Sequence, residues 1–160
     1  MKGETKIGIG DMKVLRQEGT LITYALGSCV GIALYDPVIK LGGLLHIMLP
    51  KAATPDQAKQ TPFKFADSGV GEMLRKMAAF GGVKRRYVCK IAGGAQMFQM
   101  TGPVGNIGER NIESVKEQLM AEHIQIQGED LGKNYARTML MDVSTGVVKI
   151  RTMGRNELIL

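Results

Sequence analysis

Three short apolar runs between residues 20 and 49 constrain the fold of this chain more than any other feature. They are TLITYAL (20–26), CVGIALY (29–35) and GLLHIML (43–49). Each run is short and is set off by turn-forming residues, Gly27-Ser28 after the first and Asp36-Pro37 after the second. We therefore predict three buried strands in close succession.

Two later segments carry helical periodicity instead. Val70, Met73, Leu74 and Met77 recur at helical spacing and predict a helix over 67–80, which Gly81-Gly82 ends. The sequence GPVGNIGERN (102–111) is predicted as a loop leading into a second helix, with an apolar face made of Ile112, Val115 and Leu119. Between the third strand and the first helix, the polar segment 50–65 contains three prolines and is predicted as a long surface loop.

The remaining apolar segments predict further strands. RYVCKIAGG (86–94) and IQIQGED (124–130) each indicate one strand, and TMLMDVSTGVVKIRTM (138–153) indicates a hairpin that turns at 144–146. About seven or more strands and two main helices result, and they do not alternate strictly. This order favours an α+β fold with layered mixed or antiparallel sheets over a doubly wound parallel sheet.

Length and composition limit the location and organisation of the protein. The 160 residues suit one domain spanning 1–160, and no apolar run is long enough for a membrane helix. The first ten residues lack the apolar core of a signal peptide. We therefore expect a cytoplasmic protein with no direct membrane insertion, in which Cys29 and Cys89 remain reduced.

The net charge of +6 has no concentrated source. Lys and Arg are scattered apart from the cluster at 84–86, and aromatic residues make up only 5% of the chain. Nucleic-acid binding proteins usually show a basic stripe or aromatic residues for base stacking, so nucleic acid is not expected as a partner. The charge serves either solubility or attraction to an acidic protein surface.

Cys29 and His46 form the candidate catalytic pair. If Asp36–Ile39 is a four-residue hairpin loop, Tyr35 lies opposite Lys40, and the antiparallel ladder brings Cys29 opposite His46. An adjacent imidazolium stabilises a thiolate, which can attack an amide carbonyl, and the same ring can protonate departing ammonia and activate water. Gly27 allows a sharp turn that leaves backbone N–H groups near Cys29 to bind an oxyanion.

Structural interpretations of the same residues stand beside the catalytic one. A lone cysteine in an apolar strand is commonly core filler, which is the reading we give Cys89, and a lone histidine is commonly a hydrogen-bonded structural residue. Two histidines and two cysteines so far apart in sequence make a weak case for a metal site. We predict neither a metal nor a cofactor.

Five motifs, in order along the chain, resemble the CheD family of chemoreceptor glutamine deamidases. They are ALGSCVGIALYDP, GGLLHIMLP, KIAGGAQMF, NIGERN and EDLGKNYAR. The resemblance spans nearly the whole chain. Its most specific part is Gly-Ser-Cys followed by a histidine seventeen positions after the cysteine.

The resemblance implies an enzyme that hydrolyses chosen glutamine side chains in the cytoplasmic domains of methyl-accepting chemoreceptors, releasing ammonia during chemotaxis adaptation. It implies a Cys-His-Thr catalytic set that maps onto Cys29, His46 and Thr23. It also implies a fold similar to the catalytic domain of deamidating bacterial toxins, and a CheC-type phosphatase as a common partner.

Two residues fit this picture awkwardly. A simple three-strand hairpin places Thr23 about three residues along the sheet from the level of Cys29 and His46, so either Gly27-Ser28 is not a plain hairpin turn or the strand of Thr23 lies elsewhere. Lys133 stands in EDLGKN where the family pattern has a second glycine.

Several alternatives stay open on the sequence alone. The glycines of AGGAQMF and NIGERN either shape a substrate groove or pack loops together, and Phe98 beside Met97 is either a partner-binding anchor or a core residue. A binding module for receptors or a CheC-like phosphatase, with weak catalysis, is the rival function. A thiol redox protein is the third, although it lacks a nearby resolving cysteine.

Overall fold

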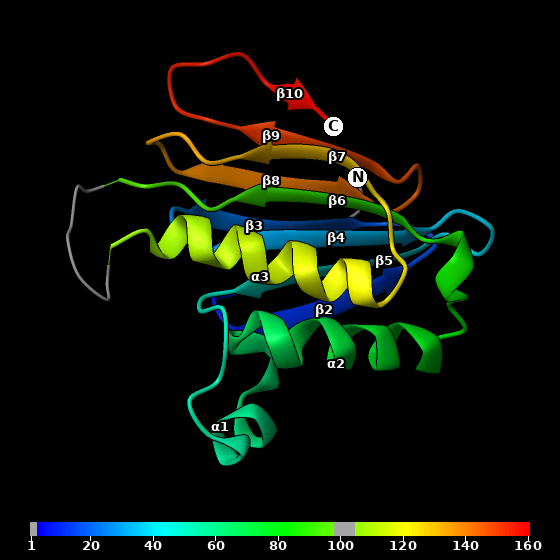
Figure 1. Cartoon of the computed structure of the whole chain (residues 1–160). Helices are drawn as coiled ribbons and strands as arrows, with labels where there is room; N and C mark the ends of the chain where they lie inside the picture. The colour runs from blue at the N-terminus through cyan, green and yellow to red at the C-terminus, as the bar shows by residue number, and fades with distance from the viewer. Residues whose placement is uncertain (1–2, 98–104) are drawn as a thin grey trace.

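Two five-stranded sheets and two long helices make up the protein in a computed structural model that describes residues 3–97 and 105–160 (Figure 1). The strands are β1 Glu4–Lys6, β2 Asp11–Arg16, β3 Thr20–Leu26, β4 Val30–Asp36, β5 Leu41–Ile47, β6 Val88–Gly93, β7 Ile126–Leu131, β8 Arg137–Asp142, β9 Val147–Arg151 and β10 Leu158–Ile159. The helices are α1 Pro55–Gln60, α2 Ala66–Ala79 and α3 Ile107–Ala121, with single 3₁₀ turns at Pro62–Lys64 and Lys84–Arg86. The α+β prediction is therefore confirmed.

Both sheets are mixed. The first sheet has the order β1-β3-β8-β9-β10, and the second sheet has the order β2-β5-β4-β6-β7. One pair in each sheet is parallel, β1 with β3 and β6 with β7, while the other pairs are antiparallel. The chain crosses from the first sheet to the second between β1 and β2, and again between β3 and β4.

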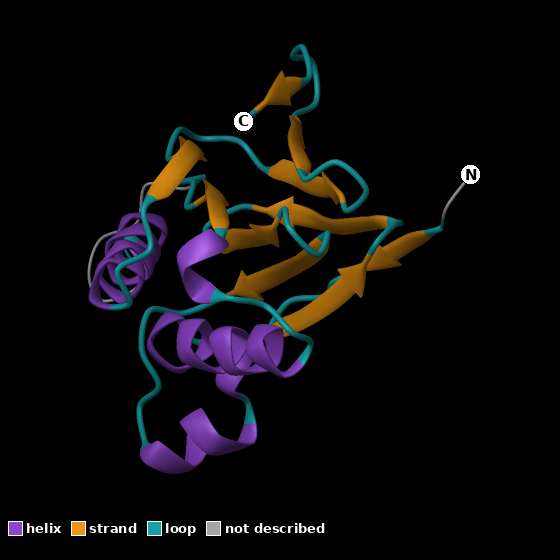
Figure 2. Ribbon diagram, turned by 90° about the vertical axis from the view of Figure 1, so that its right-hand side faces the viewer, coloured by secondary structure: helices purple, strands orange, loops and turns teal. Residues whose placement is uncertain are grey.

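The second sheet is the middle layer of the molecule. Alternate residues of β4 point to opposite faces, so Ile32 and Leu34 pack in one apolar cluster with Met73 of α2, whereas Ala33 packs in another with Met141 of the first sheet. Figure 2 shows α2 and α3 together on one side of the strands. Both faces of β4 are covered, and the strand is apolar from Val30 to Tyr35, as is typical of a strand buried on both sides.

Most predicted elements are present close to their predicted positions. The strand predicted over 20–26 is β3, the helix predicted over 67–80 is α2, and the hairpin over 138–153 is β8 and β9 with Gly146 at φ +81° in the turn. The three predicted strands do not form one hairpin sheet, however. β3 belongs to the first sheet, and β4 and β5 pair with each other in the second.

Two loop predictions were wrong. The segment 50–65 contains α1, which begins because the Thr54 hydroxyl accepts a hydrogen bond from the Gln57 N–H at 3.2 Å and Pro55 occupies the first turn. The segment 102–111 is not a loop throughout, because α3 begins at Ile107. Its glycine-rich start allows close packing: a Cβ on Gly108 would collide with the carbonyls of Gly94 and Ala95.

Candidate active site

Thr23 and His46 meet between the two sheets. Thr23 lies on β3 of the first sheet and His46 on β5 of the second, and both side chains are almost fully buried. The Thr23 Oγ1 lies 2.6 Å from His46 Nδ1 and 2.7 Å from the backbone carbonyl oxygen of Ile7. The strand of Thr23 therefore lies in a different sheet from His46. This explains how the two side chains meet, although a single hairpin sheet would place Thr23 about three residues along the sheet from His46.

The Ile7 carbonyl determines which nitrogen of His46 carries the proton. A carbonyl oxygen only accepts, so the single hydroxyl proton of Thr23 is donated to Ile7. The Thr23 oxygen must then accept from the ring, which places the proton of neutral His46 on Nδ1. The other ring nitrogen, Nε2, is left as the lone-pair nitrogen, and it has no hydrogen-bond partner among the described residues. This is the tautomer that a general base requires.

The segment between β1 and β2 holds this arrangement from both sides. Ile7 closes the contact with Thr23, and three residues later the N–H of Gly10 donates to the carbonyl of His46 at 2.8 Å. The short crossover between the sheets thus binds both partners of the Thr23–His46 pair. The sequence analysis missed Ile7 because a backbone carbonyl leaves no signal in residue type.

Burial keeps the imidazole neutral. His46 is 1% exposed, and burial lowers its pKa from the usual 6.5 to about 4. The ring is therefore a neutral base at physiological pH. The sequence analysis instead expected a charged imidazolium at His46 that stabilises a Cys29 thiolate.

Cys29 lies in the turn directly before β4 and is half-buried. The strand register differs from the predicted one by two residues: His46 pairs with Gly31, and Asp36 pairs with Leu41, because Pro37–Lys40 and not Asp36–Ile39 form the turn. Cys29 thus precedes the partner of His46 by two positions, on the same face of the sheet. It packs against the apolar cluster between the two sheets, where Thr23 and His46 also lie.

The thiol is protonated in this environment. Burial raises the pKa of Cys29, and a hydrogen bond from the residue's own backbone N–H opposes part of that rise. Cys29 and His46 are therefore a neutral thiol and a neutral imidazole at pH 7. Cys89 is fully buried in the other cluster, where burial raises its pKa to about 12, which agrees with its reading as core filler. Both cysteines are free thiols.

Two glycines let the end of β6 approach the backbone of the turn that contains Cys29. The N–H of Gly94 donates to the Cys29 carbonyl at 2.8 Å, and the N–H of Ala95 donates to the Gly27 carbonyl at 2.7 Å. A Cβ on Gly93, which has φ +112°, would collide with the Cys29 carbonyl oxygen. A Cβ on Gly94 would collide with the side chain of Ile112. These contacts support the loop-packing interpretation of the AGG glycines.

Asn111 of α3 is a further polar residue at the site, and the sequence analysis did not single it out. Its side chain is fully buried, and its Nδ2 donates to the carbonyls of Ser28 at 2.8 Å and Met48 at 3.0 Å. It therefore joins the residue before Cys29 to the segment that follows His46. The NIGERN motif had drawn attention for its glycine, and its last asparagine carried no helical or turn signal of its own.

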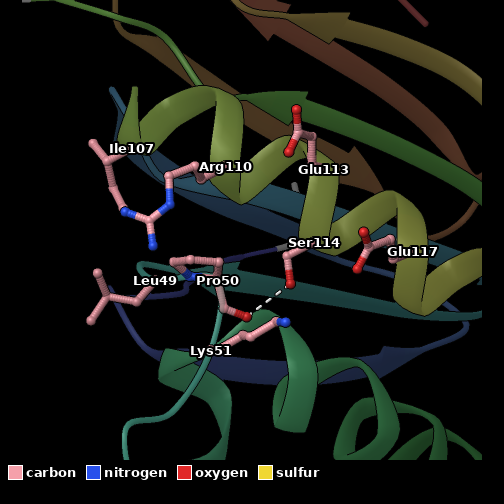
Figure 3. Close-up of a pocket in the computed structure, with 8 residues that line it drawn as sticks. All are labelled: Leu49, Pro50, Lys51, Ile107, Arg110, Glu113, Ser114 and Glu117. Carbon is pink, nitrogen blue, oxygen red and sulfur yellow. Dashed lines mark hydrogen bonds between the residues drawn. The ribbon is translucent and has the colours of Figure 1, made fainter. Parts of the chain in front are cut away.

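A groove of about 480 Å³ runs along α3 beside the site without including its chemistry (Figure 3). Pro50 and Lys51 line one side of it, and Glu113, Ser114 and Glu117 of α3 line the other. The Ser114 hydroxyl donates to the Pro50 carbonyl at 2.8 Å. Neither Thr23, Cys29 nor His46 lines this groove, so its walls do not identify the reaction.

The structure describes some, but not all, of the remaining residues that the sequence analysis named. Lys133 has φ +64°, a left-handed backbone conformation that explains why glycine is expected there. Met97 is 45% exposed, whereas Phe98 lies outside the described residues. Within residues 3–97 and 105–160, no three His, Cys, Asp or Glu side chains gather as a metal site requires, and no helix is long and apolar enough to cross a membrane.

Comparisons with known proteins agree on one family. A family model described as CheD chemotactic sensory transduction matches residues 48–152. A protein of Desulforamulus reducens is 48% identical over 94% of this chain and 92% of its own length. Proteins of Clostridium botulinum (strain Alaska E43) and Syntrophomonas wolfei are 46% and 44% identical, over 94% and 97% of both chains. All three carry the name "Probable chemoreceptor glutamine deamidase CheD".

Proposed function

The chain belongs to the CheD family, and from that premise we propose that it deamidates glutamine side chains of chemoreceptors. In this proposal Cys29 is the nucleophile, His46 is the acid and base, and Thr23 orients the ring. The observation that carries the mechanism is the Ile7–Thr23–His46 chain of hydrogen bonds, which leaves Nε2 unprotonated and without a partner between the sheets. The half-buried Cys29 packs on the same interlayer cluster.

The first half of the reaction forms a thioester. His46 Nε2 takes the thiol proton as Cys29 Sγ attacks the glutamine amide carbon, so the proton moves during attack and no charged pair is needed beforehand. The carbonyl oxygen of the substrate becomes an oxyanion. His46 then returns the proton to the amide nitrogen, the carbon–nitrogen bond breaks and ammonia leaves.

The second half restores the enzyme. Neutral His46 removes a proton from water as the water oxygen attacks the thioester carbon. The carbon–sulfur bond then breaks, the proton passes from His46 to Cys29 Sγ, and the product is a glutamate side chain. Thr23 accepts the Nδ1 hydrogen throughout, so the ring keeps its orientation in both halves.

Exposed apolar side chains around the site favour a protein as substrate. Tyr24 follows Thr23 and is 44% exposed, and Met48, two residues after His46, is 39% exposed. Ile9 lies between Ile7 and Gly10, which bond Thr23 and His46, and Met97 lies against Gly27. Each of these exposed side chains belongs to a segment that also contributes a contact at the site, and exposed apolar side chains are common where a protein binds another protein. A folded receptor segment can use these contacts to position one glutamine.

The proposal also covers the cellular location of the enzyme and a protein partner besides the receptors. The glutamines belong to the cytoplasmic domains of receptors, so we place the enzyme in the cytoplasm. A CheC-type phosphatase is proposed as a partner on the strength of the family resemblance. Co-purification of the two proteins from their native cells tests that part separately.

The proposal is tested by incubating the protein with a receptor cytoplasmic fragment and mapping glutamine-to-glutamate conversion by mass spectrometry. Cys29→Ala is expected to abolish conversion, because no other group supplies the nucleophile. Cys89→Ala is the matched control and is expected to retain activity, since Cys89 lies in the other apolar cluster. Conversion that survives Cys29→Ala, or that is lost equally in both variants, contradicts the assignment.

A further inference from the structure

Three consecutive carbonyls surround the proposed nucleophile, and each is held by a different donor. Gly27 and Cys29 accept from the backbone N–H groups of Ala95 and Gly94, which lie at the end of β6. The Ser28 carbonyl between them accepts instead from the Asn111 side chain on α3. The middle peptide group is thus the one of the three whose orientation depends on a side chain.

The direction of the Ser28 carbonyl determines the direction of the Cys29 N–H. The two groups belong to one planar trans peptide and point to opposite sides of the chain. With the carbonyl directed at α3, the N–H is directed away from the helix layer and toward the side of the second sheet that faces the first sheet. Burial raises the pKa of the Cys29 thiol and the residue's own N–H lowers it in part, which agrees with an N–H directed to the side of the chain where Sγ lies.

A backbone N–H in this position can bind the oxyanion that forms when the Cys29 sulfur attacks an amide. Oxyanion donors are effective when they are fixed in place before the charge develops. If the Ser28–Cys29 peptide rotated, its carbonyl oxygen would face the developing negative charge and repel it. A group that prevents this rotation therefore lowers the barrier without touching the substrate.

Resting on the function proposed above, we propose that Asn111 is a positioning residue that locks the Ser28–Cys29 peptide with its N–H directed at the reacting centre. The same amide group also holds the Met48 carbonyl, so it links the nucleophile turn to the segment after His46. Asn111 is fully buried, and its Oδ1 finds no hydrogen-bond partner among the described residues. A buried amide oxygen without a partner lowers the free energy of unfolding, and an apolar residue at this position would avoid that loss. The presence of asparagine here therefore fits a role beyond packing.

Ser114 supplies a matched control for this inference. It lies one helical turn after Asn111, is also buried, and donates to the Pro50 carbonyl in the same segment that follows His46. Ser114→Ala therefore removes one buried hydrogen bond between α3 and that segment but leaves the Ser28 carbonyl held. A purely structural role for Asn111 predicts similar behaviour in the two variants.

The test compares Asn111→Ala with Ser114→Ala in the full chain on a receptor fragment. Asn111→Ala is expected to lower kcat by about 10- to 100-fold, short of the loss seen when an oxyanion donor is deleted outright, and to change KM less than about twofold. The rate of Cys29 alkylation by iodoacetamide is expected to stay within about twofold, because that substitution at carbon forms no oxyanion. Ser114→Ala is expected to keep all three values near those of the unaltered protein.

The inference is overturned if Asn111→Ala retains kcat, or if kcat and the alkylation rate fall together. Asn111→Ser, whose hydroxyl is too short to reach both carbonyls, replaces Asn111→Ala if the latter does not fold. The NMR resonance of the Cys29 amide gives a readout independent of activity. It is expected to shift in the Asn111 variant and not in Ser114→Ala, and an unchanged resonance overturns the inference. If the unaltered protein does not deamidate the receptor fragment, the proposed function is refuted. If the Cys29 amide resonance still shifts in the Asn111 variant, the peptide-locking role remains supported.

Discussion

Thr23→Val tests the hydrogen-bond chain at its centre. Valine has nearly the shape of threonine, so the change removes the hydroxyl without opening a cavity. Two buried partners then lose their contact, the Ile7 carbonyl at 2.7 Å and His46 Nδ1 at 2.6 Å. A buried polar group left without a partner costs about 1–3 kcal/mol, so for two such groups we expect a loss of about 2–6 kcal/mol of unfolding free energy. In a domain of this size that lowers Tm by about 4–24 °C.

The same variant is expected to lose activity by a separate route. Without an acceptor at Nδ1, the proton is no longer held on that nitrogen, and Nε2 is no longer kept as the base. Loss of general acid–base catalysis corresponds to a fall of about 10²–10⁴ in kcat. The assay is ammonia release from a receptor fragment, measured well below the Tm of the variant so that the fraction folded does not limit the rate.

Thr23→Ser is the matched control for both effects. Serine keeps the hydroxyl and loses one methyl group, so its stability cost is about 1 kcal/mol and its kcat stays within about fivefold. The reasoning is refuted if Thr23→Val keeps a kcat close to that of Thr23→Ser. Equal and large losses in both variants would also refute it, since the methyl group would then be the essential part.

Three further predictions follow from the site and its surroundings. His46 has a folded pKa of about 4 against an unfolded value of 6.5, so the unfolded state gains the proton first and stability falls as pH drops below 6.5. Urea unfolding is expected to show a loss of about 2–3 kcal/mol from this group between pH 7 and 4.5, and His46→Gln should lack it. Because burial raises the pKa of the Cys29 thiol, the rate of Cys29 alkylation is expected to keep rising above pH 9. Alkylation of the buried Cys89 is expected to stay slow throughout. A Cys29 rate that reaches a plateau near pH 7 would indicate a preformed thiolate and contradict this prediction. Lys133→Gly is expected to raise the unfolding free energy by about 0.5–1 kcal/mol by relieving a φ of +64°, and a lower Tm would contradict this.

Strong local patterns made most of the fold predictable. Burial in β3, β4 and α2 follows local sequence patterns. An apolar run marks each of the two strands, and an apolar face with helical spacing marks α2, so all three can be predicted without knowledge of the fold. The strands β1, β2 and β10 were not predicted. β10 has only two residues, both exposed, and β2 is mostly half-buried, so neither carries a run or a clear alternation.

The sequence nominated three candidate site residues but not their arrangement. The motifs around Cys29 and His46 drew attention to those two residues, the family resemblance added Thr23, and Ile7 and Asn111 were missed. Their placement depends on the crossover at residues 7–10 and on the sheet exchange after β3, which are properties of the assembled layers. The two-residue difference in register has a local origin, because the hairpin turn is Pro37–Lys40, one residue later than the predicted turn at Asp36–Ile39.

The division of the site between two sheets makes its chemistry conditional on an intact sandwich. Thr23 comes from one layer, and Cys29 and His46 belong to the other, so any opening between the layers breaks the 2.6 Å contact before either sheet unravels. Water would then reach the imidazole, its proton affinity would return to that of an ordinary histidine, and the thiol would become an ordinary exposed cysteine. Under the proposed mechanism, a loosened or half-assembled molecule therefore lacks the oriented base that amide hydrolysis requires.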